Sequence, residues 1–289
     1  MAGRRTLMRI EAYKAHLAGK KTFSCFNKTN IDINAYLDET MKSNAVANLE
    51  KLQKLQEEKN KPAPEPAQPI NIPPKNTNYD PEHDPCFIIA NGESRRGWDL
   101  NKMKGKGYII GMNVLPVVED FWPDALVSVD ISTVKWICER NVPDKVEMWS
   151  YPRGGIKDSR VYRFPKDWGW SSGPTAVRMA LDIKKFKKFY IIGMDFFGLT
   201  KQGDIAEKAG TQINNMYKGT PRYRSANSSR TYFGNWLNQM TQNVQTHPKV
   251  NFYHVIRPGQ TSPGRLLEKS NWIDLTYDQF EQHLGKMPK

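Results

Sequence analysis

The sequence is poor in cysteine and contains no long apolar run. Its three cysteines, Cys25, Cys86 and Cys138, are far apart and form no C-x-x-C pair. This pattern excludes a disulfide framework and the usual zinc-site spacing, and it favours a reducing compartment. No segment approaches the roughly 18 consecutive apolar residues of a membrane-spanning helix, so we expect no membrane association. The basic N-terminus is not followed by an apolar stretch and does not resemble a secretory signal.

Histidine is also scarce. The chain has five histidines, and none of them lies between residues 199 and 246. His83 falls in a proline-rich segment, where we expect it to be solvated. His254 alternates with apolar residues, which indicates a half-buried structural side chain. Because possible ligands are this dispersed, the sequence predicts no metal site.

The charge balance is strongly one-sided. Lysine and arginine total 43 against 30 aspartates and glutamates, which gives a formal net charge of +13 and a pI near 9.5. Such an excess favours a polyanionic partner, either nucleic acid, an acidic protein surface or a phosphate-bearing ligand. Direct reading of bases is not indicated, because the sequence has no helix-turn-helix, zinc-finger or RNP-type motif.

Residues 1–60 are polar and mostly helical in pattern. In the first thirty residues the apolar side chains of Leu7, Ile10, Tyr13 and Leu17 recur at helical intervals beside a cationic face. A helix of this kind cannot bury much apolar surface by itself. We therefore predict a basic, helical N-terminal arm that docks on a partner.

Residues 61–85 are rich in proline, which excludes helix and favours an extended, semi-rigid linker. From Cys86 onward, short β-branched or aromatic runs alternate with amphipathic stretches near 131–140, 173–184 and 228–245. The runs are "CFIIA", "GYIIGM", "ALVSVD", "KVEMWS", "FYIIGM" and "VNFYHVI". This alternation predicts an α/β domain over residues 86–289, with a doubly wound, mostly parallel sheet of the Rossmann type.

Small polar and acidic residues follow the predicted strands. In such sheets, ligands bind where the carboxyl ends of the strands meet, so these residues are expected to converge on one pocket. They are Asn91, Gly92 and Ser94 after the first strand, Asn113 after the second, Asp130 after the third, Ser172 and Gly173 at a helix start, and Asp195 after "FYIIGM". Each also has an ordinary explanation: a tight Asn-Gly turn, a serine N-cap with Pro174 close behind, or aspartates that cap local backbone.

Two segments resemble a known family. "IANGESRRGWDLNKMKGKGYIIGMN" (89–113) and "SSGPTAVRMALDIKKFKKFYIIGMDFFG" (171–198) are similar to the two motifs of sialyltransferase-like Rossmann proteins. Bacterial glycoside-family-42 sialyltransferases and archaeal pterin diphosphokinase-like proteins share this layout. "DFWPDALVSVD" (120–130) resembles the versions of this domain that occur in bacteriophage genomes. The similarity covers about 110 residues firmly, the last 90 loosely and the first 85 not at all.

The resemblance implies a nucleotide ligand, CMP-like as in the sialyltransferases, and no required cofactor. It implies that Asn91, Gly92 and Ser94 lie near phosphate or ribose, that Asn113 lies near the phosphates, and that Ser172 and Gly173 form a helix N-terminus facing the ligand. A helix N-terminus suits an anion on physical grounds as well. Arg95 and Arg96 are expected to add bidentate phosphate contacts.

One departure from the family concerns the general base. The sialyltransferases use a histidine after the second motif, and this chain has none there. Proton abstraction near neutral pH requires a group that titrates there, and no side chain of this segment does so at its ordinary pKa. For a transferase that uses a base other than histidine, Asp195 and Asp130 are the candidates. The segment keeps aromatic and cationic phosphate binders: Tyr217, Arg222, Tyr223, Arg224, Asn227, Arg230 and Tyr232. Of these, Tyr223 is expected in the binding site.

Three functions remain open from the sequence. The first is an accessory or structural virion protein of a bacteriophage, made in the host cytoplasm. It would dock on head or tail proteins through residues 1–60 and form part of an oligomeric assembly. It would display a nucleotide-binding domain that has lost catalysis. The second is an active glycosyl- or nucleotidyl-transferase that uses a nucleotide-sugar donor. The third is a DNA-binding packaging or ejection factor that uses the positive charge.

Overall fold

A computed structural model describes residues 15, 18–19, 22–24, 30–32, 78–152, 156–204, 210–220, 222–223 and 234–287. The chain divides into two units, Met1–Ala67 and Gln68–Lys289. In the first unit, β1 (Thr22–Ser24) and β2 (Asn30–Asp32) form an antiparallel pair. The sequence did not predict these strands. Of the helices predicted for the arm, Ala15 is described and is helical, whereas most of the arm and the linker up to residue 77 lie outside the described residues.

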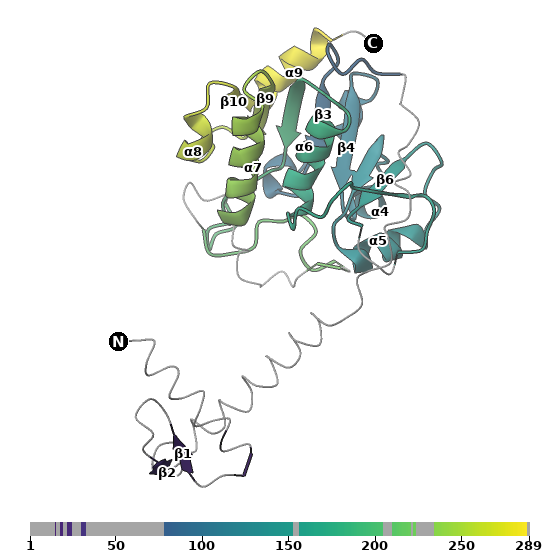
Figure 1. Cartoon of the computed structure of the whole chain (residues 1–289). Helices are drawn as coiled ribbons and strands as arrows, with labels where there is room; N and C mark the ends of the chain where they lie inside the picture. Colours follow the sequence, from purple (N-terminus) through teal and green to yellow (C-terminus); the bar gives the residue numbers. More distant parts are fainter. Residues whose placement is uncertain are drawn as a thin grey trace. The chain divides into compact units, whose positions relative to one another are not determined.

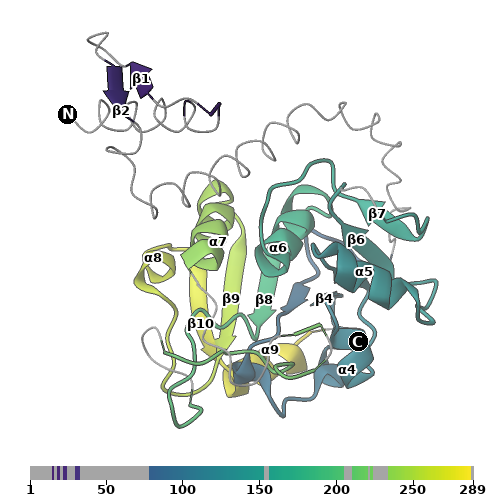
Figure 2. The ribbon, with the colours of Figure 1, turned by 90° about the horizontal axis from the view of Figure 1, so that it is seen from below.

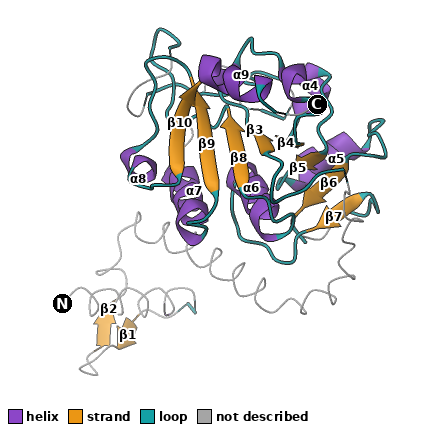
Figure 3. Cartoon of the chain, turned by 90° about the horizontal axis from the view of Figure 1, so that it is seen from above, coloured by secondary structure: helices purple, strands orange, loops and turns teal. Residues whose placement is uncertain are grey.

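The second unit contains an eight-stranded sheet in which every neighbouring pair is parallel, in the order β10-β9-β8-β3-β4-β5-β6-β7 (Figure 3). The strands are β3 (Cys86–Ile89), β4 (Tyr108–Met112), β5 (Ala125–Val127), β6 (Glu147–Ser150), β7 (Val161–Arg163), β8 (Lys188–Ile192), β9 (Asn251–Ile256) and β10 (Trp272–Thr276). The predicted doubly wound α/β fold is confirmed. Each of the six predicted runs contains a strand, whereas the edge strands β7 and β10 were not predicted.

Helices cover both faces of the sheet. They are α4 (Leu115–Glu119), α5 (Ile131–Cys138), α6 (Ser172–Asp182), α7 (Gly234–Thr246), α8 (Gly264–Leu267) and α9 (Tyr277–Gly285), with the 3-10 turns η1 (Glu93–Arg95) and η2 (Leu100–Met103). One face of β3 presents Ile88 to the core under α6 and α7, which lie in front of the sheet in Figure 1. The other face presents Phe87 and Ile89 to a second core that includes Phe280 of α9.

Burial on both faces explains why the strands read as continuous apolar runs rather than alternating ones. All four residues of β3 and all five of β4 are buried. At the far side of the sheet, α5 closes a third apolar cluster over β5 and β6, in which Val134 and Ile137 meet Leu126 and Met148. Figure 2 shows α5 beside β6 and β7, on the opposite side of the domain from α7 and α8. No helix among the described residues is long and apolar enough to cross a membrane.

The chain order reverses at the centre of the sheet. From β3 the chain builds outward through β4, β5, β6 and β7, and then returns to place β8 on the opposite side of β3. The chain connections on the two sides of β3 therefore run in opposite directions, and the loops that follow β3 and β8 lie at the point of reversal. In doubly wound folds this reversal point is where ligands bind.

A buried ion pair anchors the turn after β3. Arg95 is 1 % exposed, and its guanidinium donates two hydrogen bonds to Glu119, at 2.9 and 2.6 Å, and one to the Tyr217 hydroxyl at 2.6 Å. Its Nε donates to the carbonyl of Ala90 at 2.5 Å. Burial raises the pKa of Glu119, but the hydrogen bonds from Arg95 outweigh it and leave that pKa below its usual range. The bidentate geometry thus holds the turn, α4 and the loop at Tyr217 together.

The adjacent arginines give a matched stability test. Arg95→Ala removes the cation from Glu119, which keeps only the Tyr217 hydroxyl as a partner, so we expect a loss of about 3–5 kcal/mol in the free energy of unfolding. Arg96 pairs with Glu93 but its side chain is 56 % exposed, so Arg96→Ala is expected to cost under about 1 kcal/mol. Urea denaturation followed by tryptophan fluorescence measures both. Equal losses in the two variants would contradict a structural role for the buried pair.

Candidate functional site

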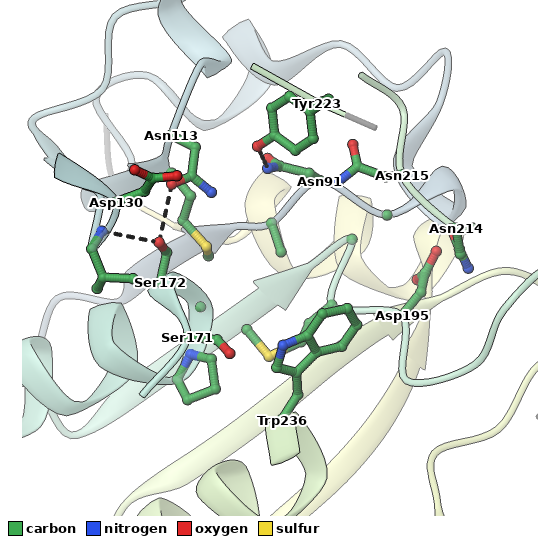
Figure 4. Close-up of a pocket in the computed structure, with 18 of the residues that line it drawn as sticks. Asn91, Asn113, Asp130, Ser171, Ser172, Asp195, Asn214, Asn215, Tyr223 and Trp236 are labelled. Atoms are coloured by element: carbon green, nitrogen blue, oxygen red, sulfur yellow. Dashed lines mark hydrogen bonds between the residues drawn. The ribbon is translucent and has the colours of Figure 1, made fainter. Parts of the chain in front are cut away.

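A cavity of about 430 Å³ opens where the loops after β3, β4, β5 and β8 meet the first turn of α6 (Figure 4). The segment 213–215, Arg222, Tyr223 and Trp236 of α7 complete its wall. The cavity therefore lies at the carboxyl ends of the central strands, beside the reversal of strand order. This is the position expected for a ligand site in a doubly wound sheet.

Most of the residues predicted from the sequence line this cavity, and three do not. Those that line it are Asn91, Gly92, Asn113, Asp130, Ser172, Gly173, Asp195 and Tyr223. Ser94 is fully buried in η1 beneath the cavity, and Arg95 is held by Glu119 and Tyr217. Arg96 is paired with Glu93. The expected phosphate contacts of Arg95 and Arg96 are therefore not formed by this arrangement, because both guanidiniums already have carboxylate partners.

Asn113 and Ser172 form a polar cluster at one end of the cavity. Asn113 has a left-handed backbone (φ 52°), a conformation that asparagine tolerates better than most residues. Its Oδ1 accepts hydrogen bonds from the hydroxyls of Ser128 and Ser172, both at 3.0 Å. Ser172 in turn accepts from the backbone N–H of Val129 at 3.2 Å. These bonds use the Asn113 oxygen and leave its amide nitrogen directed toward the cavity in Figure 4.

Asn91 and Tyr223 pair above this cluster. The Asn91 Nδ2 donates to the Tyr223 hydroxyl at 2.7 Å, and the buried Asn91 Oδ1 has no partner in the described part of the chain. Burial raises the pKa of Tyr223 to about 12, so its hydroxyl stays protonated at neutral pH and can itself donate. The Tyr223 hydroxyl thus keeps its hydrogen for an acceptor at the wall of the cavity.

Asp195 lies at the other end of the cavity, directly against the turn after β3. Its Oδ2 accepts from the backbone N–H of Ser94 at 2.9 Å. A methyl group at Gly92 would lie 2.4 Å from Asp195 Oδ2 and 2.6 Å from the carbonyl of Gly193, so only glycine fits there. Burial raises the pKa of Asp195, while the hydrogen bonds from Ser94 and the charge of nearby His254 act in the opposite direction. A carboxyl with a raised pKa can exchange a proton closer to neutral pH.

Asp130 has a simpler environment. It is exposed, and its Oδ1 accepts from the backbone N–H and the hydroxyl of Ser132, both at 3.0 Å. Asp130 is therefore the N-cap of α5, as one alternative in the sequence analysis held. It still lines the cavity, where a carboxylate can accept hydrogen bonds from ligand hydroxyls.

The first turn of α6 forms the floor of the cavity. The N-cap is Ser171, which makes no side-chain capping bond, and Ser172 is the first helical residue. This corrects the expectation that Ser172 caps the helix. The first backbone N–H groups of a helix have no partner within it and carry a partial positive charge. A methyl group at Gly173 would come within 3.0 Å of Met194 Cε, which keeps the side chain at this position small.

Several cavity residues were not predicted as site residues. Trp236 falls in a predicted helix, and its indole extends toward the cavity beside Asp195 in Figure 4. Asn214 and Asn215 belong to a loop with no strand or helix periodicity, so no sequence signal marked them. Tyr217 and Arg222 were noted only as members of a basic, aromatic stretch. Tyr217 belongs to the Arg95 network and Arg222 lies at the rim, whereas Arg224, Asn227, Arg230 and Tyr232 lie outside the described residues.

The described ranges contain no group of three or more histidine, cysteine, aspartate or glutamate residues that could hold a metal ion. Neither the protein-family models nor the curated proteins that were compared with this chain match it. The chemistry of the cavity therefore has to be inferred from its own residues.

Proposed function

We propose that the second unit binds a nucleoside phosphate in the cavity at the carboxyl ends of β3, β4, β5 and β8. The observation that carries this proposal is the meeting, in one cavity, of a helix N-terminus, several amide side chains and an indole ring. Each of these suits a different part of a nucleotide.

The phosphate would lie at the first turn of α6. Backbone N–H groups there point at the ligand, and the helix dipole favours negative charge. The Ser171 hydroxyl, which makes no capping bond, and the Asn113 side chain, bonded to Ser172, lie at this turn. Arg222, exposed at the rim, adds a cation that has no carboxylate among the ion pairs of the described residues.

The base and ribose would occupy the remaining wall. The Trp236 indole offers a flat surface on which a base can stack, a contact that does not require a particular base. Asn91 and Tyr223 can pair with ribose hydroxyls, and Asp130 supplies a carboxylate of the kind that accepts from them. This placement supports a nucleotide of the CMP type without fixing the base.

Removal of the indole tests the proposal. For the full chain titrated calorimetrically with CMP, CTP, UDP and GDP, we expect one nucleotide to bind best. Trp236→Ala should weaken that binding by about 5- to 150-fold, which corresponds to the roughly 1–3 kcal/mol of a base–aromatic stack. Trp122→Ala is the matched control, because Trp122 is also half-buried but packs on the cluster under α5. Absence of binding to all four nucleotides would contradict the proposal.

A second candidate function is group transfer from a nucleotide-sugar. The observation that favours it is Asp195, a buried carboxyl with a raised pKa at the end of the cavity opposite the α6 N-terminus. A base in that position can take the proton of an acceptor hydroxyl while the phosphate end of the donor is held at the helix. The step forms a bond between acceptor oxygen and sugar, and the nucleotide phosphate leaves with the electron pair.

Asp195→Asn separates transfer from binding. The amide keeps the shape of the side chain but cannot accept a proton, so we expect the rate of transfer or hydrolysis of a CMP-sugar to fall by about 10²- to 10⁴-fold. The affinity for the nucleotide itself should change little. Rates from product chromatography and affinities from calorimetry give the two quantities. A variant that keeps its rate would exclude Asp195 as the base.

For the whole chain we propose that it is a component of a virion, which is the function that the sequence favours. The resemblance of residues 120–130 to phage versions of the domain and the basic composition of residues 1–60 support it. Mass spectrometry of purified particles that counts copies of the chain tests this proposal. A fixed number of copies per particle is expected, and absence from washed particles would contradict it.

A further inference from the structure

The arginine that lines the cavity has no polar partner in the described part of the chain. Arg222 lies at the rim, its side chain is exposed, and its guanidinium makes no hydrogen bond and no ion pair with the described residues. Every other arginine in the described ranges donates to a carboxylate, a carbonyl or an amide oxygen; these are Arg95, Arg96, Arg140, Arg160, Arg163, Arg178, Arg257 and Arg265. Arg222 is therefore the exception among them.

The backbone at Arg222 is also unusual. Its φ of 74° is left-handed, a region that costs free energy for residues other than glycine. The next residue, Tyr223, is fixed in the cavity wall, because its N–H donates to the Thr220 carbonyl at 3.1 Å and its hydroxyl accepts from Asn91 at 2.7 Å. Backbone strain of this kind is concentrated at ligand sites, where it holds a side chain in place. It is an indication, independent of the missing partner, that Arg222 serves a ligand.

An indole of α5 positions the guanidinium. The Arg222 Cζ lies 5.9 Å from the centroid of the Trp136 ring, within the range of a cation–π contact. Trp136 is half-buried and packs against the apolar clusters that contain Leu115 and Val134, so the ring itself is held firmly. A guanidinium held by the face of a ring keeps its N–H groups for another partner.

Helix α5 also forms the wall between Arg222 and the first turn of α6. Ser172 of α6 accepts from the N–H of Val129, which lies just before α5. Thr133 of α5 lines the cavity, and Trp136 is one turn further along the same face of the helix. The wall therefore begins at the N-terminus of α6 and ends at the guanidinium of Arg222.

The two anion-binding groups are apart along this wall. Because an α-helix rises about 1.5 Å per residue, roughly 9 Å separate Asp130 from Trp136 along α5. Figure 4 shows Tyr223, the neighbour of Arg222, across the cavity from Ser171 and the first turn of α6. A single phosphate held at α6 would leave Arg222 without a partner, whereas a second phosphate attached to the first extends toward it.

The charges at the outer end of the wall favour an anion. A second guanidinium lies at the same indole, since the Arg140 Cζ is 3.5 Å from the centroid of Trp136. Asp130 also lies on this wall, but its Oδ1 is bonded to the N–H and hydroxyl of Ser132. Two cations close to one partly satisfied carboxylate leave a positive field at the rim.

We propose that Arg222 binds the second phosphate of a nucleoside diphosphate whose first phosphate lies at α6. The inference rests on the proposed nucleotide site and makes its ligand more specific: a diphosphate, either free or esterified to a sugar. The sequence resemblance, in contrast, implies a monophosphate of the CMP kind. The guanidinium suits a phosphate because two parallel N–H groups can bind two of its oxygens.

Calorimetric titration of the full chain with the mono- and diphosphates of cytidine, uridine and guanosine tests the inference, at one salt concentration because salt screens charge. For the base that binds best, we expect the diphosphate to bind about 10- to 150-fold more tightly, the range of one hydrogen bond to a charged group. Arg222→Gln should remove most of this difference and leave the affinity for the monophosphate nearly unchanged. Arg140→Gln is the matched control, because Arg140 lies at the same indole but is not among the residues that line the cavity.

The outcomes separate the inference from the nucleotide site itself. Equal native affinities for the mono- and diphosphate would overturn the inference and leave the site standing. An equal loss of both ligands in Arg222→Gln would assign Arg222 to the first phosphate, and the same loss of preference in Arg140→Gln would reveal a general effect of charge; either result overturns the inference. If none of these nucleotides binds the native chain, the site and the inference both fail. The corresponding diphosphate-sugar, titrated in parallel, distinguishes a free from an esterified diphosphate.

Discussion

Gly92 and Asp195 follow β3 and β8, which are neighbours in the sheet although the two residues are about a hundred positions apart in sequence. The rest of the cavity depends on the contact between them. The backbone N–H of Gly92 donates to the Gly193 carbonyl at 2.8 Å, and the N–H of Ser94 donates to Asp195. Since no side chain fits at position 92, the two loops can touch. They touch at the reversal of strand order, where a doubly wound sheet otherwise leaves a crevice.

The loop at 213–217 closes the same junction from outside the sheet. Asn214 accepts from the N–H of Glu93 at 2.8 Å and donates to the carbonyl of Phe197 at 2.9 Å, so one side chain joins both loops. The N–H of Met216 donates to the Asn91 carbonyl at 2.8 Å. Polar residues whose chemistry suits a ligand therefore hold the scaffold together first.

The sequence predicted the sheet well because its strands are buried on both faces and read as apolar runs. β7 and β10 were missed because they are edge strands, where Val161–Arg163 and Trp272–Thr276 mix apolar and polar residues. The positions of Asn91, Asn113, Ser172 and Asp195 followed from the rule that strand ends converge. Arg95 was assigned to phosphate because arginine makes bidentate phosphate contacts, and nothing local indicates that Glu119 and Tyr217 will enclose it.

His254 shows how a sequence pattern can indicate burial without revealing the partners of a side chain. Alternation with apolar neighbours indicates only that its side chain is buried on one face of β9. Its partners are Ser262 and Asp274, which reach it from a loop and from the next strand. The Ser262 hydroxyl donates to Asp274 and accepts from the Trp272 indole, so the imidazole adds its Nδ1–H to this buried cluster. Because these partners come from a loop and from a neighbouring strand, the local sequence around His254 gives no sign of them.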